Sequence, residues 1–225
     1  ISLCKQRDVS FINSRGSFTD SNTIQLSNSS TLVFDRCIIA TGSRPVMPQK
    51  FINNKLIIMD STEALKLSTI PEKMLVVGGG YIGLELGKVY SSLGSRVTIV
   101  EMQDGLLPNV DRDLVRPLHQ KLSNEFEAIY LNTEIISIQE SKNLGHVTMV
   151  NTKEQFGDSF DSILMSVGRR PNTDNIGLEQ TNVQLDDKGF IKVDGKRQTA
   201  DSTILAIGDA SGEPMLAHKA SHEAR

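Results

Sequence analysis

The sequence predicts an α/β fold built on a parallel sheet, and three neighbouring segments carry this prediction. Met74 to Val77 is a short apolar run with the composition of a buried strand. A glycine-rich turn follows, and from Tyr81 to Leu93 apolar residues recur at helical spacing. Arg96 to Val100 is a second apolar run. The order strand, helix, strand is typical of a βαβ unit, in which the two strands are parallel.

The glycine-rich turn has the spacing Gly78-x-Gly80-x-x-Gly83, which suits the binding of a dinucleotide. Gly78 would allow the tight turn, Gly80 would let the backbone approach a pyrophosphate, and Gly83 would let the helix pack closely on the strand. The start of a helix also offers unpaired N–H groups and the positive end of the helix dipole. The residues expected to bind the cofactor here are Gly78, Gly79, Gly80, Tyr81, Ile82 and Gly83.

The second strand of this unit ends in an acid, Glu101, which lies 23 residues after Gly78. Dinucleotide-binding folds place an acid about 20 residues beyond the first glycine, where its carboxylate accepts hydrogen bonds from the adenosine ribose. A carboxylate there repels a 2′-phosphate, and Met102 and Gln103 follow it rather than an arginine. The sequence therefore favours NAD over NADP.

Three helices are predicted in this part of the chain. The helix after the glycine turn is expected to pack on the sheet through one stripe and to end at Gly94 in a left-handed conformation. A cap at Asp60 predicts a short helix to about Leu67, and an amphipathic helix is expected at 111–126. The expected core stripes are Ile82, Leu86, Val89, Tyr90 and Leu93 in the first helix, and Leu114, Leu118 and Leu122 in the last.

The remaining elements are predicted as strands joined by polar turns. An antiparallel meander is expected to end at Thr41-Gly42, with its strands at 8–12, 23–26 and 36–40 and its turns at 14–17 and 27–31. Later strands are expected at 129–138, 146–151, 162–167, 190–193 and 203–207, and a last helix at 217–225. Breaks in the pattern near 43–50 and 168–172 indicate domain junctions.

Composition and charge argue against several classes of function. With 24 basic residues, 27 acidic residues and a net charge of −3, the chain offers no basic surface to nucleic acid or to an anionic membrane. Its apolar runs are far shorter than the about 20 residues of a membrane span. Cys4 and Cys37 lack metal or redox spacing, and His218 and His222 have no third ligand nearby, so no metal site is expected.

Five motifs follow one another along the chain. They are Ala40–Pro45, Gly78–Gly87, Gly168–Asn172, Ala206–Ala210 and Met215–Ala220. In this order they resemble the flavin- and NAD-dependent disulfide oxidoreductases, and within that family most closely the dihydrolipoyl dehydrogenases. The resemblance runs over essentially the whole chain but covers only the middle of the family's sequence.

The resemblance implies a Rossmann-like FAD/NAD(P)-binding α/β fold of three layers, in the order ββα. An NAD-binding domain at 46–170 would be inserted between two partial FAD-domain segments, 1–45 and 171–225. NAD and FAD are the implied cofactors: Glu85 would reach toward the nicotinamide, and Asp209 would accept a hydrogen bond from an FAD hydroxyl. The other residues implied at the cofactors are Gly168, Thr41, Gly42, Met215, Leu216 and Ala217.

The same resemblance implies a setting for the whole protein. It implies a homodimer that works in a 2-oxo acid dehydrogenase complex, in the bacterial cytoplasm or an organelle matrix.

The chain also departs from the family's pattern. The family's flavin chemistry needs a closely spaced cysteine pair after a glycine-rich FAD loop, and an acid–base histidine from a C-terminal domain. None of these is present in the 225 residues. We therefore expect no catalytic residue in this chain and no lipoamide turnover by it alone. The alternatives are a fragment of a relative such as mercuric reductase or soluble pyridine nucleotide transhydrogenase, or a non-catalytic NAD-binding module.

Overall fold

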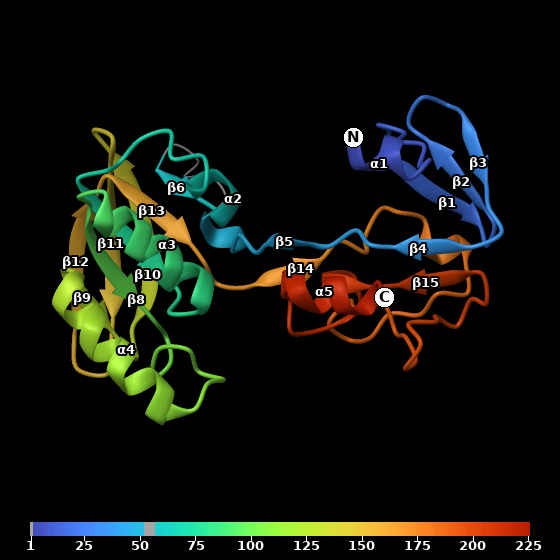
Figure 1. The fold of residues 1–225 in the computed structure, drawn as a ribbon. Helices are drawn as coiled ribbons and strands as arrows, with labels where there is room; N and C mark the ends of the chain where they lie inside the picture. The colour runs from blue at the N-terminus through green and yellow to red at the C-terminus, as the bar shows by residue number, and fades with distance from the viewer. Residues whose placement is uncertain (1, 52–56) are drawn as a thin grey trace. The chain divides into compact units, whose positions relative to one another are not determined.

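The computed structural model describes residues 2–51 and 57–225 and divides the chain into two compact units (Figure 1). Unit 1 combines Ile1–Arg44 with Arg170–Arg225, and unit 2 is Pro45–Arg169. The middle of the sequence thus forms one unit and the two ends together form the other. These boundaries fall within one residue of the domain limits expected from the sequence, whereas the cofactor assigned to each domain stays a prediction.

Unit 2 is built on a five-stranded sheet in which every neighbouring pair of strands is parallel. The strand order is β6-β13-β7-β8-β9, so β7 lies at the centre, between β13 and β8. The bounds are β6 Ile58–Met59, β7 Lys73–Val77, β8 Arg96–Val100, β9 Ala128–Tyr130 and β13 Ser162–Met165.

Both faces of this sheet are covered by other elements. Successive side chains of a strand point to opposite faces, so each strand contributes to both cores. In β7, Met74 and Val76 pack with the helices, whereas Leu75 packs with a second, antiparallel sheet. The helices are α2 Ser61–Ala64, α3 Tyr81–Ser92 and α4 Arg112–Glu125. The second sheet holds β10 Glu134–Ser141, β11 Leu144–Val150 and β12 Gln155–Phe160. These three layers are the predicted ββα arrangement.

The predicted core stripe of α3 is partly wrong. Leu86 and Tyr90 are buried, but Val89 and Leu93 keep 41% and 50% of their surface exposed. The face that packs on the sheet holds Gly83 and Gly87 instead, since a Cβ atom on either would touch strand side chains. Glycine carries no hydrophobicity signal, so the stripe of large residues showed only part of the buried face and extended to two exposed residues.

The other helices show which local signals were reliable. The Asp60 carboxylate accepts hydrogen bonds from the N–H groups of Thr62 and Glu63, and the Glu63 carboxylate accepts one from the Asp60 N–H. The predicted cap is therefore confirmed, although α2 is shorter than predicted. In α4, Leu118 and Leu122 of the predicted stripe pack in the core, as predicted, whereas Leu114 is 68% exposed and Val115 is buried in its place. Gly94, with φ +105°, follows the end of α3 as predicted.

The predicted strand 129–138 is two strands in different sheets. Asn132, with φ +48°, turns the chain between β9 in the parallel sheet and β10 in the antiparallel sheet. Sequence patterning also missed β12, because Gly157, Asp158 and Ser159 give it no apolar run.

Unit 1 contains the antiparallel meander, but with other limits than predicted. Its strands are β1 Gly16–Asp20, β2 Thr23–Leu26 and β3 Thr31–Val33, which pair in that order. Residues 8–12 form no strand and follow a short helix, α1 Ser2–Gln6. The predicted turn at 14–17 is in part the start of β1. Strand β4, Cys37–Ile39, leaves the meander and pairs in parallel with β15, Ile204–Ala206.

The remaining segments of the chain are short. Strands β5 Ser43–Pro45 and β14 Arg169–Pro171 pair with each other. The predicted strand 190–193 is a single bridge from Ile191 to Leu185. The last helix, α5, is Ala217–Glu223. Within the described residues no helix is long and apolar enough to cross a membrane.

Unit 1 holds a buried carboxylate that binds several segments together. Asp201 is 3% exposed and accepts hydrogen bonds from the Ser21 hydroxyl at 2.5 Å, from the Asn182 N–H and from both the N–H and hydroxyl of Thr203. Burial alone would raise the pKa of Asp201, but these hydrogen bonds together lower it to about 2. The charged form is therefore the one that stabilises unit 1.

We expect Asp201→Asn to lower the free energy of unfolding by about 1–3 kcal/mol, because the new NH₂ group would face donors that need an acceptor. Urea unfolding of the 225-residue chain measures this, with the exposed Asp187→Asn as matched control. Because the folded pKa lies below the unfolded value of 3.8, the contribution of about 2 kcal/mol is present above pH 4 and disappears as the pH falls toward 2. An Asp201→Asn variant as stable as the control would contradict this.

Candidate dinucleotide-binding site

The glycine turn lies where the strand order of the parallel sheet reverses. From β7 the chain passes through α3 to β8 on one side, whereas β13 borders β7 on the other side. The carboxyl ends of β7, β8 and β13 therefore meet at one edge, and open α/β sheets bind ligands in that crevice. The Gly78 N–H donates to the Val100 carbonyl, and the Ser166 N–H donates to the Val77 carbonyl, which ties the three strand ends together.

Two of the three motif glycines are required by close packing. Gly78 has φ +107°, and a Cβ atom on it would lie 2.3 Å from the Ser166 carbonyl oxygen. A Cβ atom on Gly83 would lie 2.4 Å from the carbonyl oxygen of Gly78. No side chain fits at either position, so these glycines hold α3 tightly against β7 and β13, as predicted.

Gly80 differs from the other two, because the space beside it is open. It is the N-cap residue of α3 with φ −76°, and nothing lies within 4 Å of the position where its Cβ atom would be. The fold therefore does not need glycine at this position. Open space beside a helix N-terminus, whose first N–H groups have no partner within the helix, fits the close approach of a pyrophosphate.

Glu101 is hydrogen bonded directly to the glycine turn. The residue is 9% exposed, and one of its carboxylate oxygens accepts a hydrogen bond from the Gly79 N–H at 2.6 Å. The other oxygen accepts the Gln103 N–H at 2.7 Å. The N–H of Gly79, one of the residues expected to bind the cofactor, is therefore already bonded to Glu101, whereas the first N–H groups of α3 have no partner within the helix.

A cavity of about 530 Å³ opens at this edge of the sheet. Four of the expected cofactor residues line it: Gly78, Gly80, Glu101 and Gly168. Sequence reasoning missed the remainder of the wall, which includes Lys50, Gln103, Asn109, Thr133, Glu134 and Ser166. They were missed because they lie beside the ends of β6, β8, β9, β10 and β13, where no spacing pattern marks them.

One wall of the cavity is the loop between β8 and α4, and it is held by hydrogen bonds. The Leu107 N–H donates to the Gly79 carbonyl at 2.9 Å, and Leu107 has φ +49°. The Arg112 guanidinium donates to the carbonyls of Leu106, Leu107 and Val110. A bulky residue keeps a positive φ only where the surrounding structure enforces it, so we infer that this loop has a fixed conformation.

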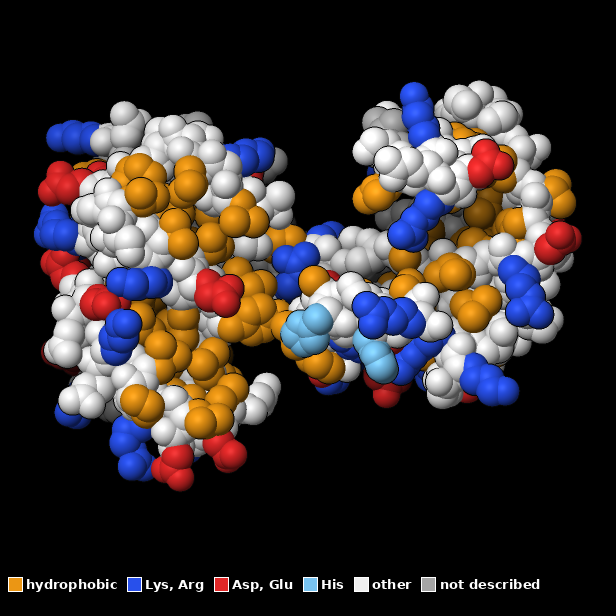
Figure 2. All heavy atoms as spheres, in the orientation of Figure 1, with side chains coloured by type: hydrophobic (Ala, Val, Ile, Leu, Met, Phe, Trp, Pro, Cys, Tyr) orange, Lys and Arg blue, Asp and Glu red, His pale blue; other side chains and the backbone are white. Residues whose placement is uncertain are grey.

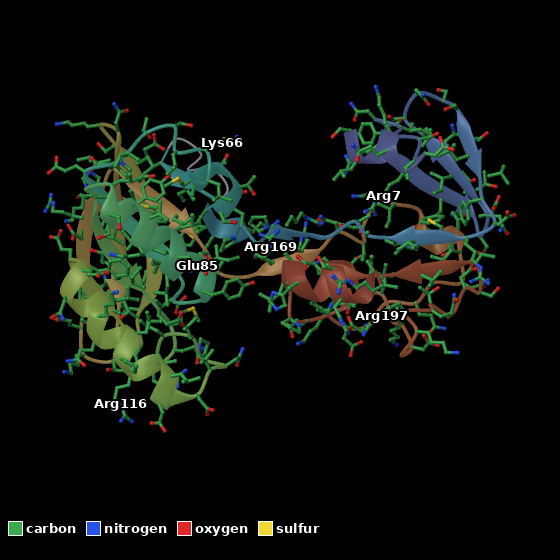
Figure 3. The ribbon with its side chains drawn as sticks, viewed as in Figure 1. Arg7, Lys66, Glu85, Arg116, Arg169 and Arg197 are labelled. Atoms are coloured by element: carbon green, nitrogen blue, oxygen red, sulfur yellow. The ribbon has the colours of Figure 1, made fainter. Side chains whose placement is uncertain are left out.

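Tyr81 and Glu85 do not line this cavity. They line a separate hollow of about 550 Å³ between α3 and α4, together with Lys88, Leu107 and Leu118 among others. Apolar side chains gather over these helices in Figure 2, and Glu85 is labelled on α3 in Figure 3. Ile82 is half buried and packs against the core. The role of Glu85 at the nicotinamide therefore stays a prediction.

In unit 1, Thr41, Gly42 and Asp209 follow the carboxyl ends of β4 and β15, which are neighbouring parallel strands. The Ser43 hydroxyl donates to the Asp209 carboxylate at 2.6 Å, which joins the two segments. Thr41, Gly42 and Asp209 therefore lie on neighbouring segments of unit 1. Met215 and Leu216 immediately precede that helix, Leu216 is its N-cap and Ala217 its first residue.

The turn that carries Asp209 is held by a buried ion-pair network. Glu223, whose side chain is 3% exposed, accepts the Gly208 N–H at 2.6 Å and pairs with Lys219 and Arg197. Burial would raise the pKa of the Glu223 carboxyl, but the Gly208 N–H and the two cations lower it below the usual range. Figure 3 labels Arg197 beside α5.

The described residues contain no group of three or more His, Cys, Asp or Glu side chains that could hold a metal ion. His218 and His222 both lie on α5, four positions apart.

A glycine turn at the switch point of a parallel sheet, with an acid at the end of the next strand, defines a dinucleotide-binding α/β protein. Comparison with protein families gives the narrower assignment. Residues 1–224 match the family described as pyridine nucleotide-disulphide oxidoreductase, and the chain belongs to that family.

Known relatives agree with this assignment. The chain is 40% identical to a dihydrolipoyl dehydrogenase of Vibrio parahaemolyticus and 39% identical to one of Haemophilus influenzae, in each case over 98% of this chain and 47% of the relative. Among solved structures, LpdA from Mycobacterium tuberculosis has a TM-score of 0.89 at 26% identity, over all of this chain and 50% of that one. The flavoprotein disulfide reductase RclA from Escherichia coli gives 0.88 at 25% identity, over 98% and 51%.

Two conclusions follow from these comparisons. The fold is the FAD/NAD-binding α/β fold that the sequence predicted, and the chain is a partial dihydrolipoyl dehydrogenase-like flavoprotein oxidoreductase region. The chain spans about half the length of the curated relatives that it matches.

The two glycines Gly80 and Gly83 should respond differently to the same substitution. We expect Gly83→Ala to lower the free energy of unfolding by about 1–3 kcal/mol, because its Cβ atom would collide with the backbone at Gly78. Gly80→Ala should cost less than about 1 kcal/mol, because its Cβ atom enters open space at a helix N-cap. Urea unfolding of both variants decides the point, and equal losses would show that the packing assigned to Gly83 is wrong.

Proposed function

We propose that unit 2 binds NAD(H) in the cavity at the carboxyl ends of β7, β8 and β13. The observation that carries this proposal is the buried Glu101 carboxylate, which is bound to the glycine turn at Gly79 and lines the same cavity as Gly80. The pyrophosphate would lie against the start of α3 beside Gly80, and Glu101 would accept hydrogen bonds from the adenosine ribose hydroxyls. Each of its oxygens already accepts one N–H and keeps a lone pair for this purpose.

We also propose that unit 1 contributes part of an FAD site in the whole protein. A carboxylate at the end of a parallel strand is a good acceptor for a sugar-like hydroxyl, and Asp209 occupies that position with Ser43 orienting it. The residues present therefore suit one hydroxyl-bearing portion of the flavin nucleotide. When bound, the flavin would supply the redox chemistry between the nicotinamide and a dithiol.

For the whole protein the proposal is a dihydrolipoyl dehydrogenase-like enzyme that oxidises dihydrolipoamide with NAD. Its support is the identity to dihydrolipoyl dehydrogenases and the order of the five motifs. Such an enzyme would act as a homodimer in a 2-oxo acid dehydrogenase complex of the bacterial cytoplasm or an organelle matrix. Mercuric reductase, soluble transhydrogenase and a non-catalytic NAD-binding module remain the alternatives, and the protein sequence beyond residues 1–225 discriminates among them.

Calorimetric titration of the 225-residue chain tests the NAD assignment. We expect NADH to bind at least tenfold more tightly than NADPH, because the Glu101 carboxylate repels a 2′-phosphate. Glu101→Gln should weaken NADH binding about tenfold and reduce the preference for NADH over NADPH. An amide has one acceptor oxygen, whereas both oxygens of the carboxylate accept hydrogen bonds from the turn and would accept them from the ribose.

Two further results bear on the same titration. Gly80→Ala should fold normally yet lose most of its NADH affinity, because the methyl group would occupy the space left for the pyrophosphate. Equal affinity for NADH and NADPH in the unmodified chain would sink the role assigned to Glu101.

The flavin assignment gives a simpler test. We expect the 225-residue chain to purify without colour, because the glycine-rich FAD loop of the family is not among its residues. An absorbance spectrum of the purified chain measures this. A yellow preparation with one flavin per chain would show that unit 1 alone holds FAD.

A further inference from the structure

The cavity of unit 2 has a lysine in its wall that the proposed NAD site does not use. Lys50 is the cation among the described residues that line this cavity. Its ammonium group donates to the Ile135 carbonyl at 2.9 Å and lies 4.9 Å from the centre of the Phe51 ring. A cation in a dinucleotide site is what a 2′-phosphate would need, so its placement bears on the choice of cofactor.

The Lys50 ammonium is paired with an acid from the same wall. Glu134 lies 3.4 Å from it, and both side chains are about half exposed, at 50% for Lys50 and 54% for Glu134. Glu134 begins β10, directly after the segment that borders Glu101: the Thr133 N–H donates to the Glu101 carbonyl at 3.0 Å, and the Asn132 N–H donates to the Gln103 carbonyl at 2.9 Å. The pair therefore lies at the end of the cavity where Glu101 would read the ribose.

We propose that the pair Lys50–Glu134 is a second determinant of dinucleotide specificity, in addition to Glu101. This inference rests on the proposed NAD site. Glu134 neutralises the lysine of the cavity and, with the Ile135 carbonyl, directs its ammonium group to the wall. A dinucleotide that carries a 2′-phosphate then meets two carboxylates, Glu101 and Glu134, and no available cation among the described residues that line the cavity.

The pair is exposed, so its effect should be moderate. Exposed ion pairs are weak individually and are screened by salt. Removing the charge of Glu134 does two things at once: it takes one negative charge away from the phosphate and it frees Lys50 to pair with that phosphate. Both changes favour a 2′-phosphorylated dinucleotide over NADH, and only the second requires Lys50.

The experiment is calorimetric titration of the 225-residue chain and its variants with NADH and NADPH at low salt. The variants are Glu134→Gln, Lys50→Met and the double variant. Glu140→Gln serves as the matched control, because Glu140 is an exposed acid of the same strand β10 that does not line the cavity. The measured quantity is the ratio of NADPH affinity to NADH affinity.

We expect Glu134→Gln to raise this ratio about three- to tenfold, and Glu140→Gln to leave it unchanged. The gain should be smaller when Lys50 is already methionine, because only the loss of the Glu134 charge then contributes, and it should shrink at higher salt. An unchanged ratio in Glu134→Gln, or an equal gain with Lys50→Met in the background, would overturn this inference while NADH binding itself stands. Absence of NADH binding in every chain, the unmodified one included, would overturn the proposed NAD site and this inference with it.

Discussion

The hydrogen bond from the Gly79 N–H to the Glu101 carboxylate, 2.6 Å long, joins the two parts of the sequence on which the candidate site depends. It connects the turn after β7 with the end of β8, and the second oxygen of the same carboxylate holds the Gln103 N–H. A buried carboxylate must be satisfied by donors, and here backbone N–H groups satisfy it. The acid that would read the ribose is thus also a support of the turn that would bind the pyrophosphate. A substitution at Glu101 therefore changes both recognition and the shape of the turn, and a stability measurement has to accompany every binding measurement.

The glycine motif shows how one pattern serves two physical purposes. Gly78 and Gly83 are required by the fold, because a Cβ atom at either would lie within 2.5 Å of a backbone oxygen. Gly80 is not required by packing, since the space beside it is empty. A residue that the fold does not need, in a motif whose other members it does need, is best explained by a ligand that occupies the space. The proposed pyrophosphate site is therefore supported by the difference among the glycines and not by their spacing alone.

Features set by neighbouring residues could be predicted from the sequence, whereas those set by residues far apart in the chain could not. The βαβ unit, the cap at Asp60 and the acid Glu101 were predictable because each is a local pattern with a direct physical cause. The packing face of α3 was predicted only in part, because Gly83 and Gly87, which a count of apolar residues does not include, let the helix approach the sheet. The loop wall held by Leu107 and Arg112 gave no signal at all, since its hydrogen bonds go from one side chain to backbone carbonyls that any sequence possesses. The parallel pairing of β4 with β15 joins residues more than 150 positions apart, which no local window can detect.

Buried carboxylates recur in both units, and their surroundings separate structural acids from the one that faces the cavity. Asp201 accepts hydrogen bonds from Ser21, Asn182 and Thr203. Glu223 accepts one from Gly208 and pairs with Lys219 and Arg197. Their pKa values are lowered because the donors converge on the charged form. Among the described residues, Glu101 accepts two backbone N–H groups and pairs with no cation, and it lines a cavity of about 530 Å³. A carboxylate placed at a cavity with acceptor capacity left over is suited to bind hydroxyl groups, whereas one whose capacity is filled by its own fold serves stability. The same comparison bears on the role proposed for Lys50. Among the described residues that line the cavity it is the cation that could weaken the preference set by Glu101, and the Ile135 carbonyl and Glu134 already hold its ammonium group.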